Sequence, residues 1–134
     1  MNAEGSCNCG SVKFEIAVGV SDVYICHCSI CRKSTGSGGI AVAVVSNDSF
    51  TWTEGEDFIK TWYKPNHDWE SSFCTNCGSS LPGKNDETTS YVPVSLLDTG
   101  YERLEVKHHL FVGSQAPWEE IAGNSTKHEK GIGE

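Results

Sequence analysis

The chain has 134 residues, 37% of them hydrophobic, and a formal net charge of −8. This length suits one domain with a modest core, and an acidic surface repels phosphate backbones, so a nucleic-acid partner is not expected. The N-terminus shows no basic segment followed by an apolar run, and the longest apolar run, Ile40 to Val45, is too short to cross a bilayer. We therefore expect a cytoplasmic protein without a membrane partner.

The residue pattern predicts a mostly β fold. Apolar–polar alternation and β-branched runs predict strands at residues 12–16, 24–26, 40–45, 50–53, 58–63, 91–96 and 104–112. The continuous run at 40–45 is expected at the centre of a sheet, whereas Pro93 is expected to place its strand at an edge or a bulge. Residues 58–63 are expected to pair with residues 50–53 across a turn.

Helix is expected only as one or two short turns. Residues 29–35 could form them, and the glycines that follow, Gly36, Gly38 and Gly39, would end them. We interpret residues 1–123 as a single domain. Residues 124–134 are polar, charged and glycine-containing, which predicts a loosely held tail.

Seven cysteines fall into three tight clusters. They are Cys7 and Cys9, then Cys26, Cys28 and Cys31, then Cys74 and Cys77. In a reducing compartment such clusters indicate metal or redox chemistry more often than disulfides. Zinc prefers four tetrahedral ligands, and catalytic zinc sites keep one position open, so seven sulfurs divide naturally into four plus three. This division predicts two zinc ions, one structural and one catalytic.

The first and third clusters together predict the structural zinc site. Cys7 and Cys9 are followed by Gly10, and Cys74 and Cys77 by Gly78. Glycine permits positive φ there, so the chain can curl and direct backbone N–H groups at the sulfurs. Two such turns supply four sulfurs. The alternatives for Cys74 and Cys77 are a thioredoxin-like pair, which needs a βαβ setting, or an iron–sulfur cluster.

The middle cluster predicts the catalytic zinc, because Cys26, Cys28 and Cys31 could all bind one ion and leave its fourth position open. Three thiolates leave such a zinc complex with a net charge of −1, so it activates water weakly and suits a further sulfur donor. Water, a substrate thiol or a histidine could fill the open position. The alternatives are a second structural site or reduced thiols without metal.

Other residues are candidates for contact with a substrate. Arg32 and Lys33 directly follow Cys31 and could offset the anionic zinc or hold substrate carboxylates. His108 and His109 alternate on a predicted strand, so only one of them can face the interior. We take His109 as the candidate for a ligand or a proton shuttle. His27 lies between two candidate ligands and is expected to point away from them.

The ordered set of motifs resembles the glutathione-dependent formaldehyde-activating enzyme family, which includes centromere protein V. The resemblance is carried by Cys7-x-Cys9-Gly10, by Cys26-His27-Cys28-x-x-Cys31-Arg32-Lys33, by Phe73-Cys74-x-x-Cys77-Gly78 and by His109-x-Phe111-Val112-Gly113-Ser114-x-x-Pro117-Trp118. It implies a compact, zinc-bearing fold of several coiled antiparallel sheets. It also implies structural zinc on Cys7, Cys9, Cys74 and Cys77 and catalytic zinc on Cys26, Cys28 and Cys31. The chain has Gln115 where such proteins often carry lysine.

The resemblance implies a reaction that joins glutathione and formaldehyde, a carbon–sulfur lyase step run in reverse. The sequence therefore favours a zinc-dependent enzyme that acts on the adduct of a thiol such as glutathione with a small aldehyde. Two alternatives are a non-catalytic zinc-binding module and a glutathione carrier or sensor. No feature of the sequence determines the oligomeric state.

Overall fold

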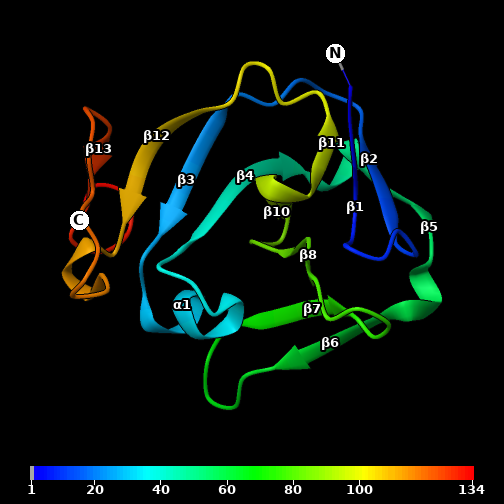
Figure 1. Ribbon diagram of the computed structural model, residues 1–134, viewed down its shortest axis with the longest axis horizontal. Coiled ribbons are helices and arrows are strands. Elements are labelled where there is room, and N and C mark those ends of the chain that lie inside the picture. The colour runs from blue at the N-terminus through cyan, green and yellow to red at the C-terminus, as the bar shows by residue number, and fades with distance from the viewer. Residues whose placement is uncertain (1) are drawn as a thin grey trace.

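The protein was analysed as a computed structural model, which describes residues 2–134 (Figure 1). The described chain is mostly β, as predicted, with one α-helix, α1 at Ser29–Thr35, followed by Gly36 in the left-handed conformation. The strands are β1 Ala3–Ser6, β2 Lys13–Ile16, β3 Asp22–Cys26, β4 Ile40–Ser46, β5 Phe50–Glu54, β6 Ile59–Tyr63, β7 Glu70–Cys74, β8 Ser80–Leu81, β9 Gly83–Lys84, β10 Thr89–Pro93, β11 Leu97–Thr99, β12 Glu105–Leu110 and β13 Thr126–Lys127.

The strands form three sheets. A four-stranded sheet has the order β11-β1-β2-β5, a six-stranded sheet has the order β13-β12-β3-β4-β10-β9, and a three-stranded sheet has the order β6-β7-β8. Most neighbouring strands are antiparallel, as predicted. The exception is β12, which runs parallel to both β3 and β13.

The largest core cluster lies between the four-stranded and six-stranded sheets. Alternation in β2 buries Phe14 and Ile16, which pack with Ala43 and Val45 of β4 and with Val92 of β10. As predicted, the run at 40–45 forms a central strand, because β4 pairs with β3 on one side and with β10 on the other. Burial of these apolar side chains on both facing sheets fixes how the two sheets pack.

Two predicted details of strand pairing are wrong. The hairpin between residues 50–53 and 58–63 does not form, because β5 pairs with β2 and β6 pairs with β7. Gly55 takes a left-handed conformation and a 3-10 turn at Glu56–Phe58 follows, so the chain leaves one sheet and enters another. Pro93 does not place its strand at an edge. It is the last residue of β10, whereas β9 pairs only with Ser90 and Tyr91. No strand on that side therefore requires a backbone N–H from Pro93.

The last residues of the chain run along β12. Thr126 and Lys127 pair with His108 and His109, and the backbone N–H of His128 donates to the His109 carbonyl over 2.8 Å. The predicted looseness of residues 124–134 in solution stays a prediction. None of the described helices is long and apolar enough to cross a membrane.

Gly5 of β1 is expected to be intolerant of any side chain. A Cβ there would contact the ring of Phe14 and lie 2.9 Å from the Leu96 carbonyl oxygen, so the strand or the core must shift. Gly5→Ala should lower the free energy of unfolding by about 2 kcal/mol, as overpacked cores do. Denaturant unfolding would measure this, with the exposed neighbour Glu4→Ala as the control. Equal stability of the two variants would contradict the packing around β1.

Candidate functional site

The first and third cysteine clusters meet in space. Cys7 and Cys9 lie in the turn after β1, and Cys74 and Cys77 lie at and after the end of β7. All four sulfurs lie within 4.8 Å of one another, with 3.6 Å between those of Cys7 and Cys9 and 3.9 Å between those of Cys9 and Cys74. The structure thus brings together the four residues paired from the sequence.

Each of the two turns that carry these sulfurs is closed by a backbone hydrogen bond from a glycine. The N–H of Gly10 donates to the Cys7 carbonyl over 3.0 Å, and the N–H of Gly78 donates to the Cys74 carbonyl over 2.7 Å. Gly10 has a φ of 79° and Gly78 a φ of 80°, which is the left-handed conformation expected from the sequence. Each glycine therefore lets its turn close around a pair of sulfurs.

N–H groups donate hydrogen bonds to two of these four sulfurs. Val12 N–H donates to the Cys7 sulfur over 3.3 Å, and the side-chain amide of Asn76 donates to the Cys9 sulfur over 3.2 Å. Hydrogen bonding, chiefly with Ser11, lowers the pKa of Cys9 to about 5. Burial instead raises the pKa of Cys74 to about 11. Four convergent sulfurs are a donor set that suits zinc in a closed, tetrahedral site.

The middle cluster is built at the junction of β3 and α1. Cys26 ends β3, Cys28 is the N-cap of α1, and Cys31 lies buried in the first turn, where its backbone N–H donates to the Cys28 sulfur over 3.3 Å. The three sulfurs lie within 4.8 Å of one another, and no fourth His, Cys, Asp or Glu ligand atom from residues 2–134 lies within that distance of all three. This group offers three donors where the other offers four.

The three thiols share protons unevenly. Hydrogen bonds with Cys26 and then Cys31 lower the pKa of Cys28, and hydrogen bonding with Cys28 raises the pKa of Cys26 to about 11. Hydrogen bonding with Cys26 and Cys28 likewise raises the pKa of Cys31. One thiol therefore ionises readily, and the other two stay neutral beside its thiolate. A bound cation would deprotonate both of them.

The surroundings of the three sulfurs are largely apolar. Cys31 is buried with Ile40, Val42 and Tyr91, and Trp69 packs against this group from the loop that precedes β7. The rings of Trp69 and Tyr91 stack with centroids 5.9 Å apart. Cys26 and Cys28 are half-buried, so these surroundings shield the sulfurs from water on one side and leave them accessible on another. The sequence did not single out Trp69 or Tyr91, because their position depends on contacts between distant strands.

His27 points away from the sulfurs beside it, as predicted. Its ring is buried and lies against His109, with 2.9 Å between His27 Nε2 and His109 Nδ1. The backbone N–H of His27 also donates to the Leu110 carbonyl over 2.9 Å. Backbone and side chain together fix this residue to the end of β12, which directs Cys26 and Cys28 to the opposite side.

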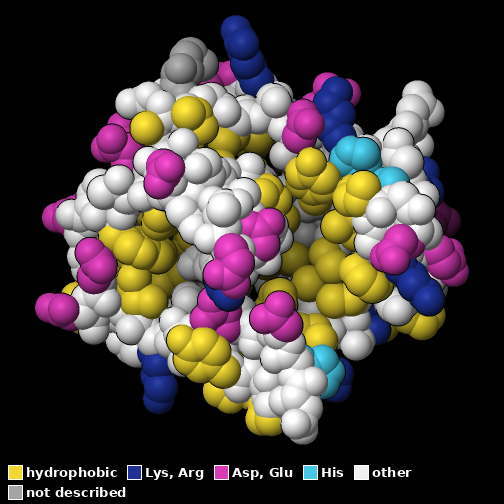
Figure 2. Space-filling view, turned by 180° about the vertical axis from the view of Figure 1, so that it is seen from behind, with side chains coloured by type: hydrophobic (Ala, Val, Ile, Leu, Met, Phe, Trp, Pro, Cys, Tyr) yellow, Lys and Arg dark blue, Asp and Glu magenta, His cyan; other side chains and the backbone are white. Residues whose placement is uncertain are grey.

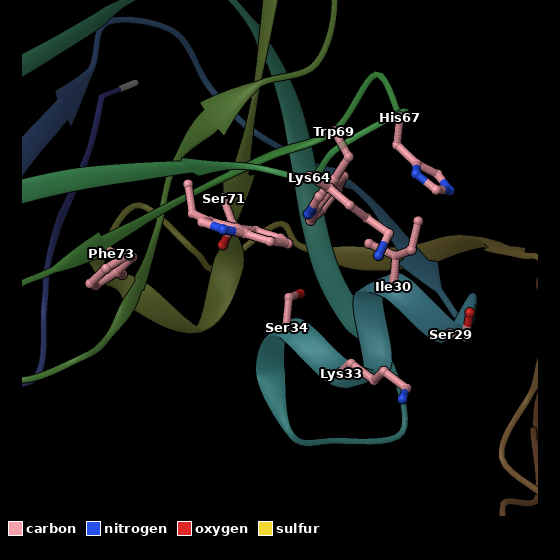
Figure 3. Close-up of a pocket in the computed structure, with 10 residues that line it drawn as sticks. Ser29, Ile30, Lys33, Ser34, Lys64, His67, Trp69, Ser71 and Phe73 are labelled. Atoms are coloured by element: carbon pink, nitrogen blue, oxygen red, sulfur yellow. The ribbon is translucent and has the colours of Figure 1, made fainter.

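The other predicted residues lie in different surroundings. His109 is buried and its described contact is with His27 rather than with the three sulfurs, so a role as ligand or shuttle stays a prediction. Burial, followed by the neighbouring His27, lowers the pKa of His109. Arg32 is half-buried, and its Nε has no hydrogen-bond partner among residues 2–134. Lys33 is exposed and lines a pocket beside α1 (Figure 3).

His109→Leu is expected to destabilise the fold. The substitution removes the only hydrogen-bond partner of the His27 ring in the described chain and leaves a buried imidazole unsatisfied, which costs about 2 kcal/mol. Denaturant unfolding at neutral pH would measure the loss. His67→Leu, at an exposed histidine, is the control and should change stability little. If both variants unfold at the same denaturant concentration, the histidine pair does not support the junction.

Over most of its length the chain is similar to known proteins of one family. Residues 2–114 match the family model described as "Glutathione-dependent formaldehyde-activating enzyme". A protein of Halomonas elongata named "Putative glutathione-dependent formaldehyde-activating enzyme" is 30% identical over 129 residues, which cover 90% of this chain and 82% of that protein. A crystal structure of a Rhodobacter sphaeroides protein has the same fold, with a TM-score of 0.60 and 23% identity over 75% of this chain and 92% of that one. The chain belongs to the glutathione-dependent formaldehyde-activating enzyme family.

Proposed function

We propose that the protein is a zinc-dependent enzyme of the carbon–sulfur lyase type. It would form or cleave the adduct between a thiol, with glutathione as the leading candidate, and a small aldehyde such as formaldehyde. Family membership supports glutathione-related aldehyde chemistry. The observation that carries the proposal is the contrast between a group of four sulfurs and a group of three, since an incomplete donor set leaves room for a substrate.

The three-sulfur group fits zinc by the chemistry of its donors. When bound by Cys26, Cys28 and Cys31, zinc would hold the substrate sulfur as a thiolate near the aldehyde. Addition forms the carbon–sulfur bond, moves the carbonyl electron pair to oxygen and requires one proton, which replaces the proton lost by the thiol. The His27 ring lies against His109 instead of the sulfurs, so we assign the return of that proton to water.

The chain's own residues contribute position more than acid–base chemistry. The hydrogen bond from Cys31 N–H fixes the Cys28 sulfur, and the strand end and the helix cap fix the backbone on both sides of it. Thiols add to formaldehyde readily in water, so an enzyme gains mainly by holding the two reactants together. Buried Tyr91 and half-buried Trp69 would limit competing water on one side of the sulfurs.

Metal analysis tests the two zinc sites separately. The wild type is expected to carry about two zinc ions per chain, and Cys28→Ser about one with the fold retained. Cys74→Ser should lose the ion that joins two distant turns and should unfold. Mass spectrometry under native conditions and circular dichroism would measure both, with Ser29→Ala as a neighbouring control. A wild type with one ion, or a Cys28→Ser variant that keeps two, would contradict the assignment.

Catalysis is tested by adduct formation above the uncatalysed rate. NMR exchange measurements with glutathione and formaldehyde should show faster exchange with the protein present, and Cys28→Ser should lower kcat/KM more than about tenfold, as disturbed metal sites do. Ser21→Ala, at an exposed residue directly before β3, is the control. Equal exchange with and without protein would remove the lyase proposal, and glutathione binding without turnover would favour a carrier.

A further inference from the structure

A cavity of about 620 Å³ lies between α1 and the hairpin of β6 and β7. Its walls combine lysines, serines and aromatic rings, among them Lys33, Lys64, Ser34, Ser71, Trp62 and Trp69. In Figure 3, Ser34 projects from the helix side toward the strand side that carries Ser71, and the Lys64 side chain extends from the hairpin toward Ile30 of α1. The size and composition suit a small polar molecule with an apolar part.

The charge of this cavity is opposite to that of the whole chain. Lys33, Lys64 and His67 line it together with uncharged residues, and no acidic residue does. The ion pairs of the described chain involve Lys13, Lys84 and Lys107, so neither lysine of the cavity is neutralised by one.

Acidic side chains lie close to the cavity but do not line it. Asp68 and Glu70 line an adjoining depression beside the hairpin loop. On the face of the molecule in Figure 2, acidic side chains surround a hollow with a hydrophobic floor. On a chain with a net charge of −8, two unpaired ammonium groups in one cavity form a local site for anions.

The cavity and the three sulfurs share structural elements. Trp69 lines the cavity and also packs against the cluster that contains Cys31, where it stacks on Tyr91. The hairpin loop that carries it is closed by the Lys64 N–H, which donates to the Trp69 carbonyl over 3.0 Å. The wall of the cavity is therefore held in place relative to the sulfurs.

The cavity and the sulfurs lie on different sides of α1. At 3.6 residues per turn, Ser29 and Lys33 lie on the opposite side of α1 from Cys28 and Cys31. A molecule whose sulfur is at the cysteines must extend past this helix to enter the cavity. A helix with its side chains is about 10 Å across, so a two-carbon thiol cannot reach, whereas a thiol of tripeptide length can.

We propose that this cavity binds the carboxylate-bearing arms of a peptide thiol and thereby selects the thiol substrate. Lys33 on the helix and Lys64 on the hairpin each bind a carboxylate, while Trp69 packs on the peptide between them. The inference rests on the proposed function, because it assumes that the substrate sulfur lies at Cys26, Cys28 and Cys31. It makes Lys33 and Lys64 determinants of specificity for thiols with two carboxylates over small uncharged ones.

Direct binding tests the cavity without catalysis. S-methylglutathione has both carboxylates but cannot form a thiolate, so calorimetry with the zinc-loaded protein reports on the cavity. Lys33→Gln and Lys64→Gln should each raise its Kd about fivefold. Lys60→Gln removes the same charge from β6 outside the cavity and should leave Kd unchanged. The diethyl ester should bind the wild type more weakly than the diacid.

Equal affinity of the diacid and the diester, or unchanged binding in both lysine variants, would overturn the inference. Kinetics separate this failure from failure of the proposed function. If the protein is active, both lysine variants should raise KM for glutathione and leave KM for 2-mercaptoethanol unchanged. An unchanged KM for glutathione would overturn the inference without contradicting the proposed enzyme activity. If no thiol is turned over, the enzyme proposal fails, and the calorimetry still decides whether the cavity binds the carboxylates.

Discussion

The convergence of four sulfurs from two distant turns is the constraint on which the rest of the structure depends. The turn after β1 belongs to the four-stranded sheet and the turn after β7 to the three-stranded sheet, and these two sheets share no paired strands. Cys7 and Cys74 are buried with Val12 and Leu81 in a cluster that is small for a core. A bound ion would therefore replace much of the apolar burial that joins sheets in larger domains, and would close a loop of 65 residues between Cys9 and Cys74.

The same constraint sets the geometry of the three-sulfur group. The loop closed between Cys9 and Cys74 contains β3, α1 and the hairpin, so both walls of the cavity lie inside it. β7 connects the two regions, because Glu70 and Ser71 at its start adjoin the cavity and Cys74 at its end supplies a sulfur. Loss of the four-sulfur group would therefore displace the hairpin from the helix even though the three cysteines near α1 remain close in sequence.

Local features of the fold and site could be predicted from the sequence, and features that depend on distant contacts could not. Spacing and ligand number predicted both cysteine groups, and alternation predicted β2 and the central β4. β1 was missed because Ala3–Ser6 has small residues and no apolar alternation. The predicted pairing partner of residues 58–63 was wrong because the 3-10 turn at Glu56–Phe58 directs the chain into a different sheet, where β6 pairs with β7. Alternation indicated that one of two histidines faces inward, but its contact with His27 depends on the register of β12 with β3.

The negative charge expected at a three-thiolate zinc site gives a reason for the location of Lys33 and Lys64 away from the sulfurs. A zinc ion bound by the three thiolates would carry a net charge of −1, and the chain around it carries −8. Both the site and the whole chain would therefore repel an approaching thiolate that also bears carboxylates. Binding through sulfur alone must then overcome that repulsion. Cations about a helix diameter away would attract the carboxylates without contacting the sulfurs. They would offset the repulsion and leave the thiolate its negative charge and its nucleophilicity. A lysine directly beside the sulfurs would instead stabilise the thiolate and weaken its attack on the aldehyde.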